Sequence, residues 1–165
     1  LCDLMNMRIR SRTLLLDTNL LLLLFIGGKN PSLIQTSKTL SAFTEDDYDL
    51  LEEVISENSF NQLVTTPHIM TEVSNLQGKD RGSIPQLGRE AMAEFLNKCR
   101  EHVDSSALLV SDPMFYRLGL TDVAISVASK LPAFVLTVDA DLYFHVSKAG
   151  LEAENFNPIR QGSWQ

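Results

Sequence analysis

The alternation of short apolar runs with helical patterns limits the fold of this sequence more than any other feature. Four runs have the length and the apolar or β-branched composition of buried strands: Thr13–Leu16, Gln62–Thr65, 108–110 and Phe134–Thr137. Strands that alternate with helices form βαβ units, in which neighbouring strands run parallel and helices cover the sheet. The sequence therefore predicts an α/β fold with a central parallel sheet of four to five strands, flanked by helices in three α/β/α layers.

The segments between these runs carry signals for the starts and ends of helices. Thr44 and the Thr66-Pro67 pair are typical N-terminal caps, and the Gly27-Gly28 pair is typical of a helix end. Residues 29–43 are expected to form a loop or an irregular helix. Helices are predicted over residues 18–26, 45–57, 67–77, 86–103, 121–130 and 140–149.

Length and composition fit a single domain. A chain of 165 residues can bury roughly two-thirds of its unfolded surface around one core. No stretch is rich enough in Pro, Gly or Ser to divide two domains, so we expect one domain over residues 7–157. The chain opens on Leu, and residues 1–6 are expected to be an expression remnant or an unusual start site. Residues 158–165 are expected to form a C-terminal tail.

The charge balance limits how the protein can bind nucleic acid. The sequence has 21 acidic and 14 basic side chains, which gives a formal charge of −7. Domains that bind nucleic acid through bulk charge usually carry a basic surplus. The acidic balance argues against that mode of binding, although it does not exclude a nucleic-acid substrate whose phosphates are bound in another way.

The cysteines and the N-terminal apolar run indicate where the protein works. The two cysteines, Cys2 and Cys99, lie far apart, with no Cys or His at metal-ligand spacing. This predicts neither a disulfide framework nor a zinc site, and it favours the cytoplasm. The apolar run over residues 14–26 is interrupted by Asp17 and Asn19 and is shorter than the roughly 20 residues that span a bilayer. We therefore predict neither a signal peptide nor a membrane partner.

Four acidic residues occupy positions where α/β proteins often place their chemistry. Asp17 and Asp139 directly follow predicted strands, and ligands bind beyond the carboxyl ends of the strands in open parallel sheets. Glu72 and Asp122 lie in helices with otherwise apolar surroundings. Each acid also has a structural interpretation, because Asp17 and Asp139 suit helix caps and the other two suit partly exposed helix positions.

Carboxylates that gather at one edge of a sheet would need a cation. Two unit charges near ~4 Å repel by about 4 kcal/mol at an effective dielectric constant of 20. Mg²⁺ or Mn²⁺ would relieve this repulsion, since both prefer oxygen ligands. A site with one or two such ions suits the hydrolysis of phosphodiesters.

The same residues occur in four ordered motifs that resemble the PIN-domain ribonucleases, a family that includes toxins of bacterial toxin–antitoxin pairs. The motifs span most of the chain and are Leu-Leu-Asp17-Thr18-Asn19, Thr66-Pro67-x4-Glu72-Val73, Leu120-Thr121-Asp122-Val123-Ala124-Ile125 and Leu136-Thr137-x-Asp139-x-Asp141-Leu142. The stretch between the first and second motifs is longer than in minimal toxins of the family, with the extra material around residues 29–57.

The resemblance implies a PIN-like fold and a metal-dependent endoribonuclease that cuts RNA with a metal-activated water. It makes Asp17, Glu72, Asp122 and Asp139 the catalytic acids that bind Mg²⁺ or Mn²⁺. Asp141 becomes a weaker candidate ligand, for which a solvated acid in a first helical turn is the alternative. Asn19 and Thr137 become supporting polar groups. An antitoxin and a second copy of the chain are further candidate partners.

Basic residues near the motifs are candidates for contact with RNA phosphates. Lys79 and Arg81 follow the helix of Glu72, and Arg117 precedes Asp122. For each of them, an ordinary solvated position is the alternative interpretation.

Two other functions remain open. A non-catalytic module could keep the PIN fold and bind RNA or protein. A phosphatase of the haloacid-dehalogenase type also begins with an aspartate after a strand, but that family needs a second acid where this chain has Asn19.

Overall fold

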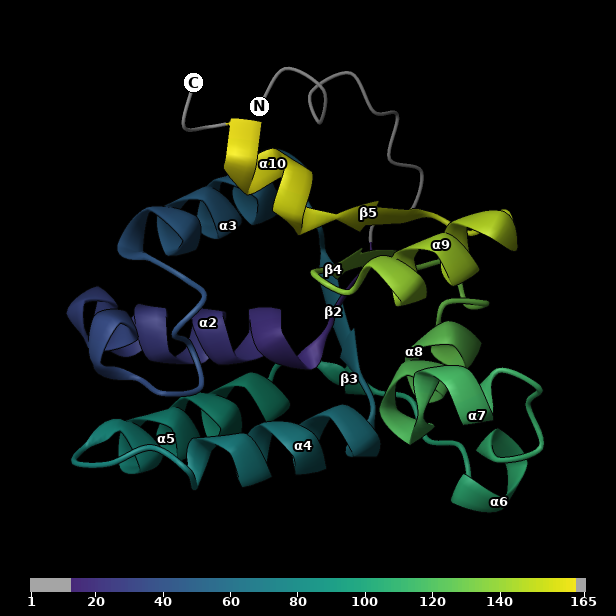
Figure 1. The fold of residues 1–165 in the computed structure, drawn as a ribbon, viewed down its shortest axis with the longest axis horizontal. Coiled ribbons are helices and arrows are strands. Elements are labelled where there is room, and N and C mark those ends of the chain that lie inside the picture. Colours follow the sequence, from purple (N-terminus) through teal and green to yellow (C-terminus); the bar gives the residue numbers. More distant parts are fainter. Residues whose placement is uncertain (1–12, 163–165) are drawn as a thin grey trace.

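The computed structural model describes residues 13–162, and these form one five-stranded sheet in which every pair of neighbouring strands is parallel. The strand order is β3-β2-β1-β4-β5 (Figure 1). The strands are β1 (Thr13–Leu16), β2 (Gln62–Thr65), β3 (Arg100–Glu101), β4 (Phe134–Thr137) and β5 (Ala153–Asn155). The predicted α/β class with a central parallel sheet is confirmed.

Helices cover both faces of this sheet. Figure 1 shows α2 to α5 on one face and α6 to α9 on the other, which gives the three predicted layers. The helices are α2 (Thr18–Lys29), α3 (Glu45–Glu57), α4 (Pro67–Gln77), α5 (Ile84–Leu96), α6 (Ser106–Leu109), α7 (Phe115–Leu118), α8 (Leu120–Ala128), α9 (Ala140–Lys148) and α10 (Phe156–Gly162), with a 3₁₀ turn, η1, over Pro31–Thr36. Among the described residues, no helix has both the length and the apolar character needed to cross a membrane.

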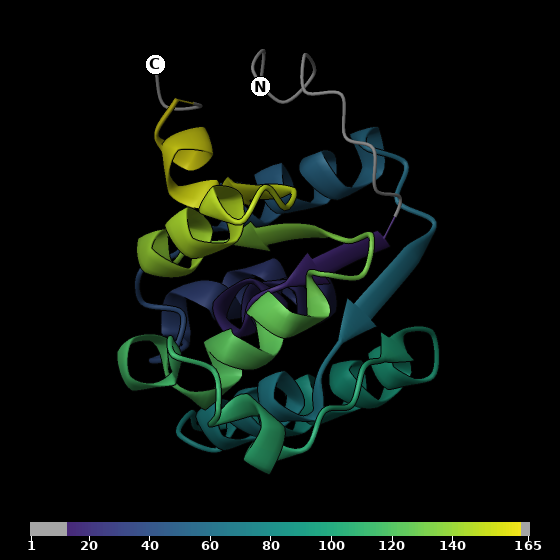
Figure 2. The same cartoon turned by 90° about the vertical axis from the view of Figure 1, so that its right-hand side faces the viewer.

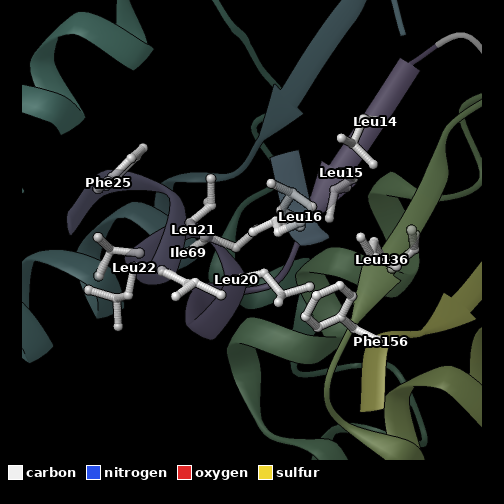
Figure 3. Packing of buried hydrophobic residues seen from close by; sticks show 14 of the residues in the cluster. Leu14, Leu15, Leu16, Leu20, Leu21, Leu22, Phe25, Ile69, Leu136 and Phe156 are labelled. Atoms are coloured by element: carbon white, nitrogen blue, oxygen red, sulfur yellow. The ribbon is translucent and has the colours of Figure 1, made fainter. Parts of the chain in front are cut away.

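The core forms where the central strands meet α2. The leucines of β1 and all four residues of β4 are fully or almost fully buried, because helices cover both faces of these two strands. Figure 3 shows Leu20 of α2 pointing toward the ring of Phe156, close to the leucines of β1. Burying each large apolar side chain contributes roughly 1.5–3 kcal/mol. This packing fixes the carboxyl ends of β1 and β4, where two of the candidate acids lie.

The prediction that the first helix stops at Gly27-Gly28 was wrong, because α2 continues to Lys29. The ring of Tyr48 on α3 packs directly on Gly27, and a Cβ atom at that position would overlap the ring. The glycine therefore allows close packing of α3 on α2 and does not end the helix. The side chain of Asn30 then accepts a hydrogen bond from the amide of Ser32 and opens η1.

The predicted helix over 86–103 was right as far as Leu96 and wrong beyond it, and the predicted strand over 108–110 was wrong. Helix α5 ends at Leu96, and the chain then adds strand β3 beside β2, with Val64 opposite Arg100. Residues 108 and 109 belong to α6, where the hydroxyl of Ser105 accepts a hydrogen bond from the Leu108 amide. Pairing with the sheet overrides the helical pattern that continues past residue 96.

The segment predicted as a C-terminal tail, 158–165, begins inside helix α10, and residues 163–165 lie outside the described residues. Residues up to 162 belong to α10, and the guanidinium of Arg160 bonds both carboxylate oxygens of Asp47 on α3, each at 3.0 Å. The same group lies 4.9 Å from the ring centre of Phe43. Tertiary contacts therefore hold this helix against α3. Residues 1–6, expected to precede the domain, lie outside the described residues.

Candidate functional site

Asp17 lies at the carboxyl end of β1 and joins three elements. Its Oδ1 accepts a hydrogen bond from the Leu20 amide at 2.9 Å and caps α2. Its Oδ2 accepts from the Thr137 hydroxyl at 2.6 Å and from the Val138 amide at 2.7 Å, both at the end of β4. Burial raises the pKa of Asp17 above its ordinary value, and these hydrogen bonds offset part of that rise. Asp17 therefore both caps a helix and forms the centre of a polar network.

Thr137 connects Asp17 to Asp139. The buried Thr137 hydroxyl donates to Asp17 and accepts a hydrogen bond from the Asp139 amide at 2.9 Å. The exposed carboxylate of Asp139 caps α9 by accepting from the Leu142 amide at 2.9 Å. The last residues of β4 thus bring the second strand-end acid next to the first.

Glu72 reaches this network from α4. Its Oε2 accepts a hydrogen bond from the hydroxyl of Thr18 at 3.1 Å, and Thr18 directly follows Asp17 in the chain. Thr18 was not singled out in the sequence, although its place inside the first motif was the available signal. Its hydroxyl links an exposed acid of α4 to the start of α2.

Asp122 completes the group from the first turn of α8, a helix that lies in front of β1 in Figure 2. Burial, together with the negative charges of Asp139, Asp17 and Glu72, raises the pKa of Asp122 to about 7. No residue in the described range donates a hydrogen bond to its carboxylate. Asp122 is therefore the acid whose pKa all three of the other acids raise.

Asp141 and Asn19 lie at the margin of this group. Asp141 is exposed on the first turn of α9 and pairs with Arg117 of α7, with 2.6 Å between Oδ1 and Nη2. Asn19 is exposed in the first turn of α2. Arg117 is thus the candidate phosphate-binding residue that the structure brings to the acidic side of the sheet.

The structure does not bring Lys79 and Arg81 to the acids. Both are exposed in the turn between α4 and α5, which Figure 1 shows at the end of α4 away from α8. Asp80, between them, is buried and accepts hydrogen bonds from Ser37, Thr39 and the Lys38 amide. These bonds fix the turn against the segment that follows η1.

The donor chemistry of the four acids fits a hard divalent cation, because all of them supply carboxylate oxygens. Yet no group of three or more His, Cys, Asp or Glu side chains within residues 13–162 is arranged as a metal site. The hydrogen bonds explain this arrangement, since Asp17, Glu72 and Asp139 are each turned toward a donor of the protein. A bound ion would have to compete with these donors.

Two further polar atoms near the site were not predicted. The Thr65 hydroxyl, at the carboxyl end of β2, and Nδ1 of His68 are buried without a hydrogen-bond partner in the described part of the chain. Nε2 of His68 lies 3.2 Å from the hydroxyl of Ser106 on α6. The Thr66-Pro67 helix start shows in the sequence, but the contact of His68 with α6 joins residues 38 positions apart and does not.

Comparison of the chain with protein-family models, with curated proteins and with solved structures found no match. A functional assignment therefore has to rest on the arrangement of the residues described above and on the motifs in the sequence.

Proposed function

We propose that this protein is a metal-dependent endoribonuclease of PIN type, with Mg²⁺ or Mn²⁺ held by Asp17, Glu72, Asp122 and Asp139. The observation that carries the proposal is the electrostatic convergence on Asp122, whose pKa of about 7 reflects burial and the three neighbouring acids. A partly buried acid whose pKa is raised by acids from other parts of the chain is typical of functional sites.

The four acids have different roles in this proposal. Asp17 is the rigid member, since three hydrogen bonds fix its orientation. Asp122 is the member most in need of a cation, because it is partly buried and accepts no hydrogen bond from the described residues. Glu72 and Asp139 have exposed carboxylates and can turn from their present donors toward a ligand.

The chemistry of the reaction follows from this arrangement. A bound divalent ion supplies neutralising charge and lowers the pKa of water, which suits hydrolysis of a phosphodiester. The chain itself positions the carboxylates, and the Thr137 hydroxyl keeps the ends of β1 and β4 in register around them. RNA as the substrate and an antitoxin as a partner rest on the resemblance of the four motifs to PIN ribonucleases, whereas a cytoplasmic setting rests on the two widely separated cysteines.

RNA cleavage with Mg²⁺ or Mn²⁺ tests the proposal. We expect cleavage by the wild type and a loss of at least about a hundredfold in Asp17→Asn and Asp122→Asn, because each substitution removes one charged ligand. Asp46→Asn is the matched control, since Asp46 is an exposed acid in the first turn of α3. Cleavage that persists in both site variants would rule out the proposed site.

One observation favours a non-catalytic RNA- or protein-binding module as the second candidate. The described residues include no group already arranged to hold a metal. Calorimetric titration with Mn²⁺ separates the two functions, because the module requires no divalent ion and the nuclease does. The phosphatase remains the weakest candidate, since Asn19 occupies the position of its second acid, and turnover of a generic phosphomonoester would be needed to support it.

A further inference from the structure

Two aromatic side chains are strongly exposed near the acidic site. Tyr116 on α7 is 91% exposed and Phe144 on α9 is 65% exposed, whereas Phe25, Phe134 and Phe156 are buried in the core. Rings exposed to this extent contribute little to the core of the fold. Their exposure therefore calls for an account in terms of binding.

An ion pair ties both rings to the edge of the acidic group. Arg117 on α7 bonds Asp141 on α9 at 2.6 Å, and Tyr116 directly precedes Arg117 in the chain. Phe144 follows Asp141 by three residues and so lies on the same side of α9. Since α9 begins at the Asp139 cap, both rings lie on elements that border the acids.

Neighbouring rings support both exposed rings. The ring of Tyr116 meets that of Phe115 with 5.3 Å between centroids, and the ring of Phe144 meets that of Tyr143 at the same separation. Contacts of this kind restrict the motion of an exposed ring. Each outer ring therefore presents a face to solvent. Because the ring is already restricted, it loses less conformational entropy when a ligand binds.

We propose that Tyr116 and Phe144 stack against bases of a single-stranded RNA and hold it across the Arg117–Asp141 pair. The proposal rests on the proposed nuclease function and names the residues that bind its substrate. Stacking on aromatic side chains binds single strands without a basic groove, because every base has a π face. This matters for a chain of charge −7, in which bulk charge cannot attract phosphates.

Arg117 adds a contact to the phosphate backbone. Its guanidinium has more N–H donors than the pair with Asp141 uses, and its side chain is 62% exposed. A strand that stacks on the two rings would pass this group. Arg117 thus supplies a local positive charge between the two stacking rings, each of which can accept any base.

A protein partner is the competing occupant, and the chemistry of the surface favours RNA. Exposed aromatic rings suit both protein interfaces and nucleic-acid bases, so the groups beside the rings decide between the two occupants. The two aromatic rings flank an ion pair at the border of a carboxylate group. That combination of ring faces and one arginine matches a nucleic-acid strand.

The test compares two labelled oligonucleotides of about 12 nucleotides, a uridine strand and an abasic strand with the same phosphates. Binding is measured by fluorescence anisotropy at low salt in EDTA, so that cleavage does not contribute. We expect the wild type to prefer the uridine strand. Tyr116→Leu and Phe144→Leu should each lower the affinity for the uridine strand about tenfold, since leucine keeps apolar area but removes the π face. The affinity of each variant for the abasic strand should stay within twofold of the wild-type value.

Two further variants complete the design. Arg117→Gln should lower the affinity for both strands and reduce the salt dependence of binding, because it removes a phosphate contact. Val103→Ser removes an equally exposed apolar side chain, 66% exposed beyond β3, and should change neither affinity. All four substitutions are at exposed positions, so thermal unfolding should show that each variant folds.

The outcomes separate this proposal from the nuclease function. Leucine variants that bind the uridine strand as the wild type does would overturn base stacking and assign the rings to a protein contact. Equal loss for both strands, or a wild type without preference for the uridine strand, would also overturn it. Base-dependent binding without any metal-dependent cleavage would support stacking and reject the nuclease function. Metal-dependent cleavage without base-dependent binding would support the nuclease function and reject stacking.

Discussion

Asp17 and Asp47 are both buried aspartates near the start of a helix, but the protein treats them differently. Asp47, 1% exposed, lies in the capping box of α3, and Arg160 of α10 bonds both of its oxygens. Asp17, 5% exposed, accepts only neutral hydrogen bonds and has other acids for neighbours. No basic side chain of the described residues pairs with Asp17, Glu72, Asp122 or Asp139.

This difference distinguishes a structural carboxylate, Asp47, from Asp17, which we propose to be a metal ligand. A buried charge is stable when the chain supplies the opposite charge, as Arg160 does for Asp47. Asp80 shows that neutral donors suffice for one isolated buried carboxylate, since three of them surround it. Within residues 13–162, the group around Asp17 combines burial with several like charges and no basic partner, and that combination favours a cation from solution.

The largest expected effect comes from breaking the structural pair. Arg160→Met leaves Asp47 buried without its cation and should lower the free energy of unfolding by about 3 kcal/mol. Arg117→Met is the matched control, because it breaks an exposed pair and should cost less than about 1 kcal/mol. Urea denaturation measures both values, and equal losses would contradict the contrast between buried and exposed pairs.

A smaller loss should follow from removing one donor of Asp17. Thr137→Val keeps the shape of the side chain but removes the hydroxyl, and it should lower the free energy of unfolding by about 2 kcal/mol. Ser37→Ala removes a comparable donor of Asp80 and serves as the comparison. The account further expects Thr137→Val, but not Ser37→Ala, to weaken Mn²⁺ binding. A metal affinity unchanged in Thr137→Val would show that this hydroxyl does not shape the site.

Removing a charge from the acidic group should raise the free energy of unfolding, whereas the two preceding substitutions lower it. Asp122→Asn should raise the stability of the metal-free protein on the order of 1 kcal/mol at pH 8, because it relieves repulsion at a partly buried acid. Asp46→Asn, at an exposed position in α3, should not stabilise the protein, since it removes a charge favourable to the helix N-terminus. A lower melting temperature for Asp122→Asn in EDTA would argue against a repulsive cluster.

The pH dependence of stability follows from the same group. The folded pKa of Asp122, about 7, exceeds the ordinary aspartate value of 3.8, and the folded pKa of Asp17 is also raised. The folded state therefore binds more protons between about pH 4 and pH 7, and its stability decreases as pH rises through that window. Urea unfolding in EDTA at pH 5 and pH 8 should show this decrease, and Asp122→Asn should make it smaller. An equal change in wild type and variant would contradict the raised pKa.

The fold was predictable from the sequence where local signals are strong. Strands β1, β2 and β4 and helix α4 have the predicted bounds, because apolar runs and the Thr66-Pro67 start act over a few residues. The exceptions depend on distant partners. Gly27 stays helical because Tyr48 packs on it, and β3 forms because β2 offers an edge. The polar strand β5 lacks the apolar run by which β1, β2 and β4 were identified.

The candidate site was likewise predictable where local signals suffice and not where distant contacts decide. The positions of Asp17 and Asp139 after strands predicted that they lie at one edge of the sheet, and the Thr137 hydroxyl links them there. The bond between Thr18 and Glu72 was not predictable, since it joins residues 54 positions apart. Sequence proximity likewise suggested phosphate contacts for Lys79 and Arg81, but the bonds of Asp80 hold their turn elsewhere.

Binding of Mn²⁺, measured by calorimetry at pH 8, tests most directly whether the acids around Asp17 form a metal site. We predict that the wild type binds one or two ions and that Asp46→Asn binds them equally well. Asp17→Asn and Asp122→Asn should each bind at least about tenfold more weakly, because each loses one charged oxygen ligand. A wild type that binds no Mn²⁺, or site variants that bind it as tightly as the wild type, would contradict this account.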